Sequence, residues 1–509
     1  MALSSPGVYV SEGPLKARVN NINLSSSVAA FFGTSGRGPV TPTLVQSWTE
    51  YTANFGSIST DYDLGYALYH YFANGGTSAY VTRVVGTGAS VSTTSSNVKY
   101  YTSSALAASA VGTLCTVTAT NPGVWGNSLS VVLSDGLVAA SATVIPTFNL
   151  TVYLNSVEVE RWTELSALPS SSRYITSIIN NYSKYIDVSN VITPVVNTFW
   201  GVKAGSNALA SGADGAAPLA AGWVSSFDLL DTVSGVLMIN AVGQSDTTIV
   251  AAVLAKASAR GNSIALIDPA TGNTDAAAFI SEVTSHRSSA GANYGIYCAP
   301  MLTMIDPARS GPAALRRTFP SGPIAGLYAR TEAERTVGKT PAGYGADIRN
   351  ALGVDIKFKE SEIGTLYDAG INCLKQLPGS AVVLFGGRTL ERLNPDRYVS
   401  VRRSLNYLKQ SLSDATQFAI FEPNDSRLRS AVSAACGNVL SSFWSAGGLK
   451  GTSPQQAYYV VCDESNNTGV SVDNGEVRVE IGVALQQPAE FIVIQLSQWT
   501  GGSNAVETL

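Results

Sequence analysis

The sequence contains few charged residues. Asp, Glu, Lys and Arg make up 13% of its 509 residues, compared with ~25% in typical soluble domains. With a formal net charge of −4, the chain lacks the strongly basic surface that nucleic-acid-binding proteins use, and no nucleic acid is expected as a partner. We expect much of the surface to be covered by other protein. A compact, unusually neutral globular protein is the alternative.

Cysteine and histidine are also scarce. The five cysteines lie far apart, form no CxxC pair and cluster with no histidine, so neither a zinc site nor a disulfide framework is predicted. We expect buried thiols in a reducing cytoplasm. The two histidines and the absence of a GxSxG elbow provide no catalytic set. We therefore predict no catalytic residues, no bound metal and no cofactor.

Long apolar runs are missing as well. No stretch approaches the ~20 apolar residues of a membrane span. The first residues lack the basic start and apolar run of a signal peptide. The sequence therefore predicts no membrane insertion.

The clearest local pattern is an amphipathic helix over residues 399–416. Val401, Leu405, Leu408 and Leu412 recur at i, i+4, i+7 and i+11, which places them on one helical stripe. A strand is predicted at residues 417–422, ended by a Pro-Asn-Asp turn. A second helix should run over residues 427–444, capped by Asn424 or Asp425.

Strands and helices alternate in the middle of the chain. Strands are expected at residues 233–240, 263–267 and 293–299, with helices at 247–259 and 275–288 between them. This alternation predicts parallel strands joined by right-handed crossovers. Two carboxylates near the strand ends, Asp268 and Asp306, could in principle bind a metal, although Asp-Pro is more often a turn that ends a strand.

Residues 86–212 differ in composition. Short alternating strands at residues 116–120, 129–133 and 149–159 are separated by the turns Asn121-Pro122-Gly123 and Asp135-Gly136. Repeated short strands with turn residues are typical of an all-β domain. We interpret this stretch as an inserted domain on the outside of the molecule, where variation is tolerated.

One stretch resembles a nucleotide-binding loop. Gly338-Lys339-Thr340 ends like a P-loop, but that motif needs a glycine five residues before Gly338, where Ala333 stands inside a probable helix at residues 326–335. The phosphate-binding backbone cannot be assumed, and a nucleotide-dependent enzyme is kept only as an alternative.

Four segments resemble, in order, motifs of the contractile-tail sheath proteins of myovirus-type phages and related injection machines. They are residues 372–390 (NCLKQLPGSAVVLFGGRTL), 398–425, 458–467 and 475–498. Further upstream, residues 6–10 (PGVYV) and 28–40 resemble the family's opening and its entry into the core domain. Residues 335–342 resemble another sheath motif, except that Gly338 replaces its tryptophan.

The resemblance implies that strands at both ends of the chain are donated to neighbouring copies. An unpaired terminal strand is what β-augmentation requires. The residues concerned are Val8, Tyr9 and Val10 at one end and Phe491, Ile492, Val493 and Ile494 at the other. Residues 12–26 and 486–488 are interpreted as hinges. A frayed terminus and a terminal hairpin are the ordinary alternatives.

A surface facing a tail tube is also implied. The candidates are Arg402, Arg403, Lys409, Asp463, Glu464 and Asp473. For the arginines, solvated charges or internal salt bridges are at least as good an explanation.

The expected fold is an α/β core, with a mixed sheet and flanking helices, plus an inserted all-β domain and extended terminal strand arms. The expected boundaries are 1–27 (arm), 28–85 (core), 86–212 (outer β domain), 213–370 (core), 371–487 (inner domain) and 488–509 (arm).

The expected function is that of a structural sheath subunit which is not an enzyme and is located in a virion tail after assembly in the host cytoplasm. Its partners would be copies of itself, the tail tube, and baseplate and terminator proteins. A non-contractile surface adhesin is a further alternative.

Overall fold

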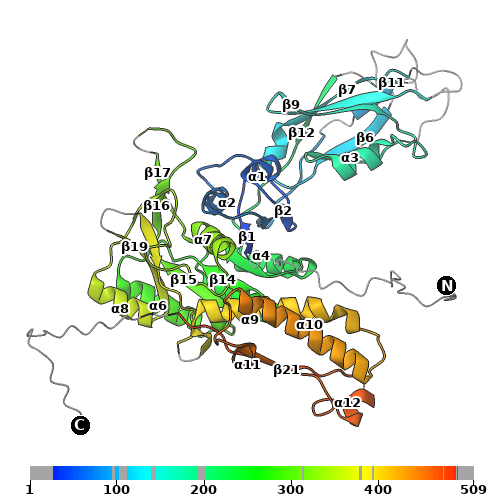
Figure 1. Ribbon diagram of the computed structural model, residues 1–509. Helices are drawn as coiled ribbons and strands as arrows, with labels where there is room; N and C mark the ends of the chain where they lie inside the picture. The colour runs from blue at the N-terminus through cyan, green and yellow to red at the C-terminus, as the bar shows by residue number, and fades with distance from the viewer. Residues whose placement is uncertain are drawn as a thin grey trace, which may run out of the picture.

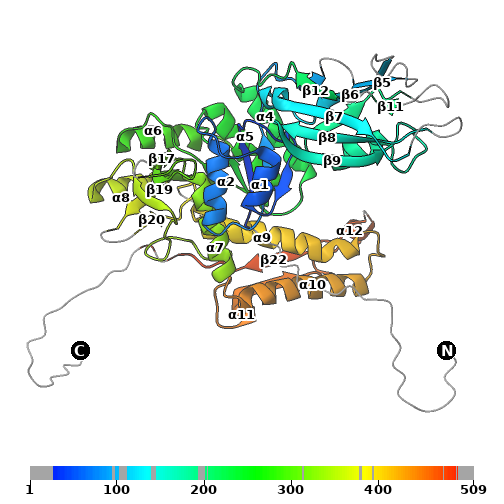
Figure 2. The ribbon, with the colours of Figure 1, turned by 90° about the horizontal axis from the view of Figure 1, so that it is seen from above.

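A computed structural model describes residues 27–490 apart from residues 95–97, 102–111, 139–144, 193–200, 203–204, 312–313, 378–380, 393–394, 474 and 489. Figures 1 and 2 show a central mixed sheet with helices on its faces, a β domain on one side of it and a helical unit on the other. Within the described residues no helix is both long enough and apolar enough to cross a membrane.

The central sheet has eight strands in the order β2-β3-β1-β13-β14-β15-β19-β20. The inner strands are parallel, and β2 and β20 run antiparallel at the two edges. The bounds are β1 Val28–Gly33, β2 Thr43–Val45, β3 Ala79–Arg83, β13 Leu237–Ala241, β14 Ile264–Ile267, β15 Gly295–Ala299, β19 Ile371–Gln376 and β20 Val382–Phe385.

The predicted parallel β–α–β–α–β order is confirmed in β13, α5, β14, α6 and β15. The first of these strands starts later than expected, at Leu237, because a 3-10 turn occupies residues 229–232 and Gly235 adopts a φ of 99°. Strands β19 and β20 complete this same sheet, although the sequence-based boundary at residue 371 placed them in the inner domain.

Both faces of the sheet are covered. Phe31 and Phe32 of β1 point to opposite sides, as strand geometry requires. Phe31 packs edge-on against Tyr71 of α2, with ring centroids 5.3 Å apart, and Phe32 against Phe227 of α4, 5.0 Å apart. One face is covered by α2 (Asp63–Ala73) and α7 (Ser321–Glu334), and the other by α4 (Ala220–Asp228), α5 (Thr247–Arg260), α6 (Ala276–Arg287) and α8 (Glu360–Asp368).

The β domain is a nine-stranded antiparallel sheet inserted between β3 and α4, with its own apolar core. Its elements are β4 Thr93–Thr94, β5 Val98–Tyr101, β6 Gly112–Ala119, β7 Leu129–Asp135, β8 Phe148–Leu154, β9 Val157–Leu165, α3 Ile175–Tyr182, β10 Ile186–Ser189, β11 Gly201–Val202 and β12 Gly205–Ala210. The single strand expected at residues 149–159 is wrong. Asn155 and Ser156 take positive φ and form the tight turn between β8 and β9.

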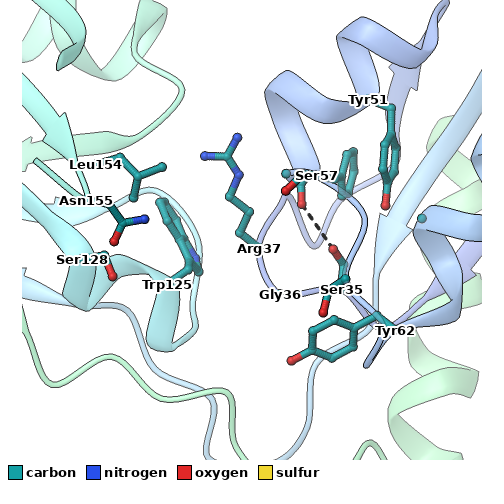
Figure 3. A pocket seen from close by; sticks show the side chains of 14 residues that line it. Ser35, Gly36, Arg37, Tyr51, Ser57, Tyr62, Trp125, Ser128, Leu154 and Asn155 are labelled. Atoms are coloured by element: carbon teal, nitrogen blue, oxygen red, sulfur yellow. Dashed lines mark hydrogen bonds between the residues drawn. The ribbon is translucent and has the colours of Figure 1, made fainter. Parts of the chain in front are cut away.

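The β domain meets the core around two arginines. Arg83, at the end of β3, is buried and donates to the carbonyl oxygens of Ser35 and Pro122, and pairs with Asp214. Arg37 extends into a cavity of about 350 Å³ between the core and Trp125 of the β domain (Figure 3). These contacts attach the β domain to the core near the end of β3.

A helical unit follows the central sheet. It contains α9 (Val399–Thr416), α10 (Ser426–Ser445), α11 (Pro454–Ala457), β21 (Tyr458–Val461), α12 (Gly469–Asp473) and β22 (Glu480–Val483). The second predicted helix is confirmed as α10, with Asp425 as its cap: its carboxylate accepts the Leu428 N–H at 2.7 Å. Outside the helical unit there is also a separate three-stranded sheet. It consists of β16 (Leu302–Ile305), β17 (Leu315–Thr318) and β18 (Ala351–Val354).

Candidate functional site: an open two-stranded sheet

The sheet of the helical unit has only two strands, β21 and β22. They run antiparallel, with Tyr458 opposite Val483 and Val461 opposite Glu480. One face packs through Val460, Ile481 and Val483 on Leu440 and Phe443 of α10 and on Leu408 of α9. The apolar alternation in these strands is therefore explained by a single covered face.

The outer edges of this small sheet carry no further strand in the part of the chain that the structure describes, although Leu449 forms an isolated antiparallel bridge with Leu485 just after β22. In that part of the chain, β21 and β22 pair with each other and with no other strand. Two-stranded sheets are marginally stable by themselves. Strand edges with free N–H and C=O groups accept strands from other chains. The outer sides of β21 and β22 are therefore candidate sites for the addition of a further strand.

The expected strand at residues 476–485 is shorter than predicted. Only Glu480–Val483 forms β22, and the chain before it, described except for residue 474, forms a loop that contains α12 and is held at Asn467. The buried Asn467 side chain donates to the carbonyl oxygens of Asp463 and Arg478, and accepts the N–H of Arg478. This loop carries three of the predicted tube-facing residues, Asp463, Glu464 and Asp473, and all three are exposed.

Arg402 and Arg403 of α9 do not face outward. They are 6% and 3% exposed. Arg402 pairs with Asp396 and lies 4.6 Å from the ring centroid of Tyr294. Arg403 pairs with Glu332 of α7 at 2.7 Å. The prediction that these two arginines face the tube is therefore corrected, because they form the internal salt bridges given as the alternative. Lys409 on the same helix is exposed.

The reason is that α9 has two buried faces. The expected stripe packs toward α10, with Leu408 and Leu412 in the apolar cluster there. A second stripe, made mostly of polar residues, spans the amino-terminal ends of the parallel strands. In it the Asn406 side chain donates to the Ser263 carbonyl oxygen just before β14, at 2.9 Å. Hydrophobic periodicity alone could not find this second face because its side chains are polar.

The turn between α9 and α10 was also missed. The strand predicted at residues 417–422 is wrong: a 3-10 turn covers Gln417–Ala419, and no described strand pairs with this segment. Phe418, Ile420 and Phe421 are exposed, Phe421 completely, with a φ of 69°. Aromatic and β-branched residues are common in strands, but here they form an apolar surface on a turn.

The amino-terminal candidates Val8, Tyr9 and Val10 and the carboxyl-terminal candidates Phe491, Ile492, Val493 and Ile494 lie outside the described residues. Their roles remain predictions. The last described residue before the second group is Glu490, whose carboxylate is bound by Arg388 and Tyr367.

The nucleotide alternative does not fit the local structure. A P-loop joins a strand to a following helix, whose amino end faces the phosphates. Here Gly338-Lys339-Thr340 follows α7, and the next element in the chain is β18. These three residues line a cleft of about 900 Å³ between the core and the helical unit, but no helix amino terminus follows them.

The two carboxylates considered for a metal have other partners. The Asp268 carboxylate accepts the N–H of Gly243 and both the N–H and the hydroxyl of Ser321. Burial raises the pKa of Asp268 to about 6, against the lowering effect of these hydrogen bonds. Asp306 accepts the Tyr66 hydroxyl at 3.0 Å. Among the described residues there is no group of three or more His, Cys, Asp or Glu that could hold a metal ion.

Comparison with known proteins agrees with this description. The model of the phage tail sheath protein central domain matches residues 222–390, and that of the phage tail sheath C-terminal domain matches residues 395–498. Together they match more than half of the chain.

Two curated tail sheath proteins are similar in part. The one from Vibrio phage KVP40 is 30% identical over 176 residues, which is 34% of this chain and 25% of that protein. The one from Enterobacteria phage T4 is 31% identical over 171 residues, 33% of this chain and 25% of that protein. The matched stretch thus spans a quarter of each curated relative.

Solved structures share the fold along nearly the whole chain. The helical sheath of the anti-feeding prophage in its contracted state has a TM-score of 0.58 at 19% identity, covering 98% of this chain and 100% of that one. The sheath tail protein of Listeria innocua has a TM-score of 0.61 at 13% identity, covering 90% and 94%. From the two family models, the curated relatives and the shared fold, the chain belongs to the phage tail sheath family.

Proposed function

We propose that this chain is a structural subunit of a contractile tail sheath in a virion. It polymerises helically around a tail tube and contracts by rigid-body rearrangement, which drives the tube through the host cell envelope. The observation that carries the proposal is the two-stranded β21–β22 sheet, whose outer edges have no partner strand among the described residues. In a member of the sheath family, such edges are acceptors for strands of other copies.

The donors are the two ends of the chain. Residues 8–10 of one neighbour and residues 491–494 of another add to the two edges and produce a four-stranded sheet built from three copies. Main-chain hydrogen bonds supply the affinity in this mode of recognition. Because donor and acceptor are different surfaces, each contact leaves a free donor and a free acceptor, so the assembly grows as an open filament.

Contraction then requires no catalytic site in this chain. Subunits rotate and slide as rigid bodies while the exchanged strands stay paired, and residues 12–26 and 486–488 act as hinges. The extended state is kinetically trapped, and contacts formed between cores in the contracted state supply the free energy. Modest gains per subunit sum over a long polymer.

The inner surface comprises Lys409, Asp463, Glu464 and Asp473 and contacts the tail tube. The exposed turn containing Phe418 and Phe421 belongs to the same unit: Ala419 packs in one apolar cluster with Val477 and Val479. Baseplate and terminator proteins cap the two ends of the polymer.

Electron microscopy of the purified chain tests the proposal. Hollow ribbed tubes are expected from the full chain, and none from chains lacking residues 1–12 or residues 491–509. A full chain that remains monomeric at high concentration, or truncated chains that still form normal tubes, would refute strand donation. Thin unribbed fibres would instead favour a non-contractile adhesin.

A further inference from the structure

A buried ion pair fixes the chain at Glu490, just before the proposed carboxyl-terminal donor strand. The Arg388 guanidinium binds the Glu490 carboxylate with two nitrogens, Nη2 to Oε2 at 2.7 Å and Nε to Oε1 at 3.1 Å. The Tyr367 hydroxyl donates to the same Oε1 at 2.6 Å. We call Arg388, Tyr367 and Glu490 the clasp.

The clasp is shielded from water. The Arg388 side chain is 12% exposed and that of Glu490 is 8% exposed. The guanidinium carbon also lies 4.0 Å from the Tyr367 ring centroid. Bidentate arginine–carboxylate pairs fix both distance and orientation, and weak screening strengthens them when they are buried.

The electrostatic balance keeps the Glu490 carboxylate charged. Burial acts to raise its pKa, but the hydrogen bonds from Arg388 and Tyr367 and the positive charge of Arg388 outweigh burial, so the pKa lies below its usual value. Asp368 also accepts from Arg388, at 3.2 Å, which leaves the arginine a second partner if Glu490 is removed.

Two of the three clasp residues, Tyr367 and Arg388, belong to the core, so the clasp ties Glu490 to the core and not to the helical unit. Tyr367 lies on α8, and Arg388 follows β20 at the edge of the central sheet. Between β22 and the clasp, residues 486–488 line the 900 Å³ cleft that separates the two parts. On the other side of the cleft, the Gln486 side chain donates to the Leu449 carbonyl oxygen at 3.3 Å. Residues 486–488, the predicted hinge, are therefore attached to the helical unit at one end and to the core at the other.

We propose that the clasp positions the carboxyl-terminal strand for donation, by anchoring its root to the central sheet of the core instead of the acceptor sheet beside it. This inference rests on the proposed function. A fixed root restricts the directions in which residues 491–509 can leave the molecule. Under this proposal the strand would start from the core and be available to the β21–β22 edges of a neighbour.

The variant Glu490→Ala tests the clasp. Because Asp368 remains as a partner for Arg388 when Glu490 is removed, the arginine is not left unpaired, and the purified monomer should keep its circular dichroism spectrum and melt within a few degrees of wild type. The critical concentration for sheath assembly, measured by sedimentation, should rise about tenfold, because the freed root must be ordered again on donation. Tyr367→Phe removes one of the hydrogen bonds and should act in the same direction with a smaller effect.

The matched control is Glu158→Ala, which removes an arginine–carboxylate pair of similar geometry from the surface of the β domain, with Arg161 at 2.7 Å. It should leave the critical concentration unchanged. Deletion of residues 491–509 separates the two proposals. If the deletion abolishes assembly while Glu490→Ala assembles like wild type, the clasp has no positioning role and strand donation stands. If the deletion has no effect, donation fails and the clasp inference fails with it.

Discussion

At the scale of single residues, His70 is a buried histidine whose environment disfavours its charged form. It is completely buried on α2, and neither ring nitrogen has a hydrogen-bond partner among the described residues. Burial lowers its pKa to about 4, with Asp306 acting in the opposite direction. The protein therefore holds this imidazole neutral at pH values where a free histidine is charged.

This burial predicts a loss of stability in acid. Below pH ~6.5 the unfolded chain binds a proton that the folded chain does not bind until pH ~4. The folded state is therefore destabilised progressively as the pH falls through this window, by about 3 kcal/mol in total. His70→Leu should abolish this contribution. The measurement is the free energy of unfolding in urea at pH 7 and pH 4.5 for both proteins.

Asp268 also contributes to the pH dependence of the free energy of unfolding. Its raised pKa works in the opposite sense, because the folded chain binds its proton more readily and the associated stability is lost as the pH rises from ~4 toward ~6. Wild type and variant share this contribution, so their difference isolates His70. Equal pH dependence in the two proteins would contradict the prediction.

At the scale of elements, α9 connects the core and the helical unit. Breaking a buried ion pair by removing one partner is costly because the other charge remains buried. We expect Arg403→Ala to lower the free energy of unfolding by about 3–5 kcal/mol, since Glu332 loses a partner and the contact with Tyr328 is lost. Lys409→Ala on the exposed face should change it by less than ~0.5 kcal/mol. Chemical denaturation of both variants is the measurement.

A substitution in the turn after α9 should weaken association with the tail tube without lowering the stability of the monomer. Phe421 is fully exposed and has the left-handed φ of 69°, a conformation that costs non-glycine residues about 1 kcal/mol. Phe421→Gly relieves this strain, so the free energy of unfolding of the monomer should not fall, whereas association with the tail tube should weaken. Co-sedimentation with purified tubes measures the second effect, and unaltered binding would show that this turn does not contact the tube.

Local sequence patterns predicted elements whose partners lie nearby in the chain. The β13–α5–β14–α6–β15 order and α10 with its Asp425 cap follow from periodicity and capping. Patterns failed where a distant segment decides the structure. Residues 417–422 have strand composition but pair with no described strand, and Arg403 is charged yet buried because Glu332, 71 positions earlier in the chain, lies opposite it. The clasp joins residues about 100 positions apart, and no local signal marked it.

On the scale of the whole molecule, the β domain is separable from the core. Its apolar cluster contains no residue of the central sheet. Its two connections lie side by side, because Ser90 bridges Ala213 and the Ala216 N–H donates to the Thr87 carbonyl oxygen at 3.1 Å. The β domain thus behaves as an insertion that can be removed at its base.

We expect replacement of residues 90–213 by Gly-Gly to leave a folded chain that still forms tubes. The Arg83 side chain would lose its bond to the Pro122 carbonyl oxygen but keep Ser35 and Asp214, which should cost about 1–2 kcal/mol. Calorimetry and electron microscopy are the measurements. An aggregated product, or a folded chain unable to form tubes, would show that the β domain is needed for the core or for the polymer.

The two buried faces of α9 have a mechanical consequence. One helix is bonded to the central sheet along one side and packs on α10 along the other, so α9 couples the core to the helical unit. In the proposed sheath, a rotation of the helical unit would therefore be transmitted to the core through α9. The flexibility of the proposed polymer would then lie mainly in the segments that link one copy to the next.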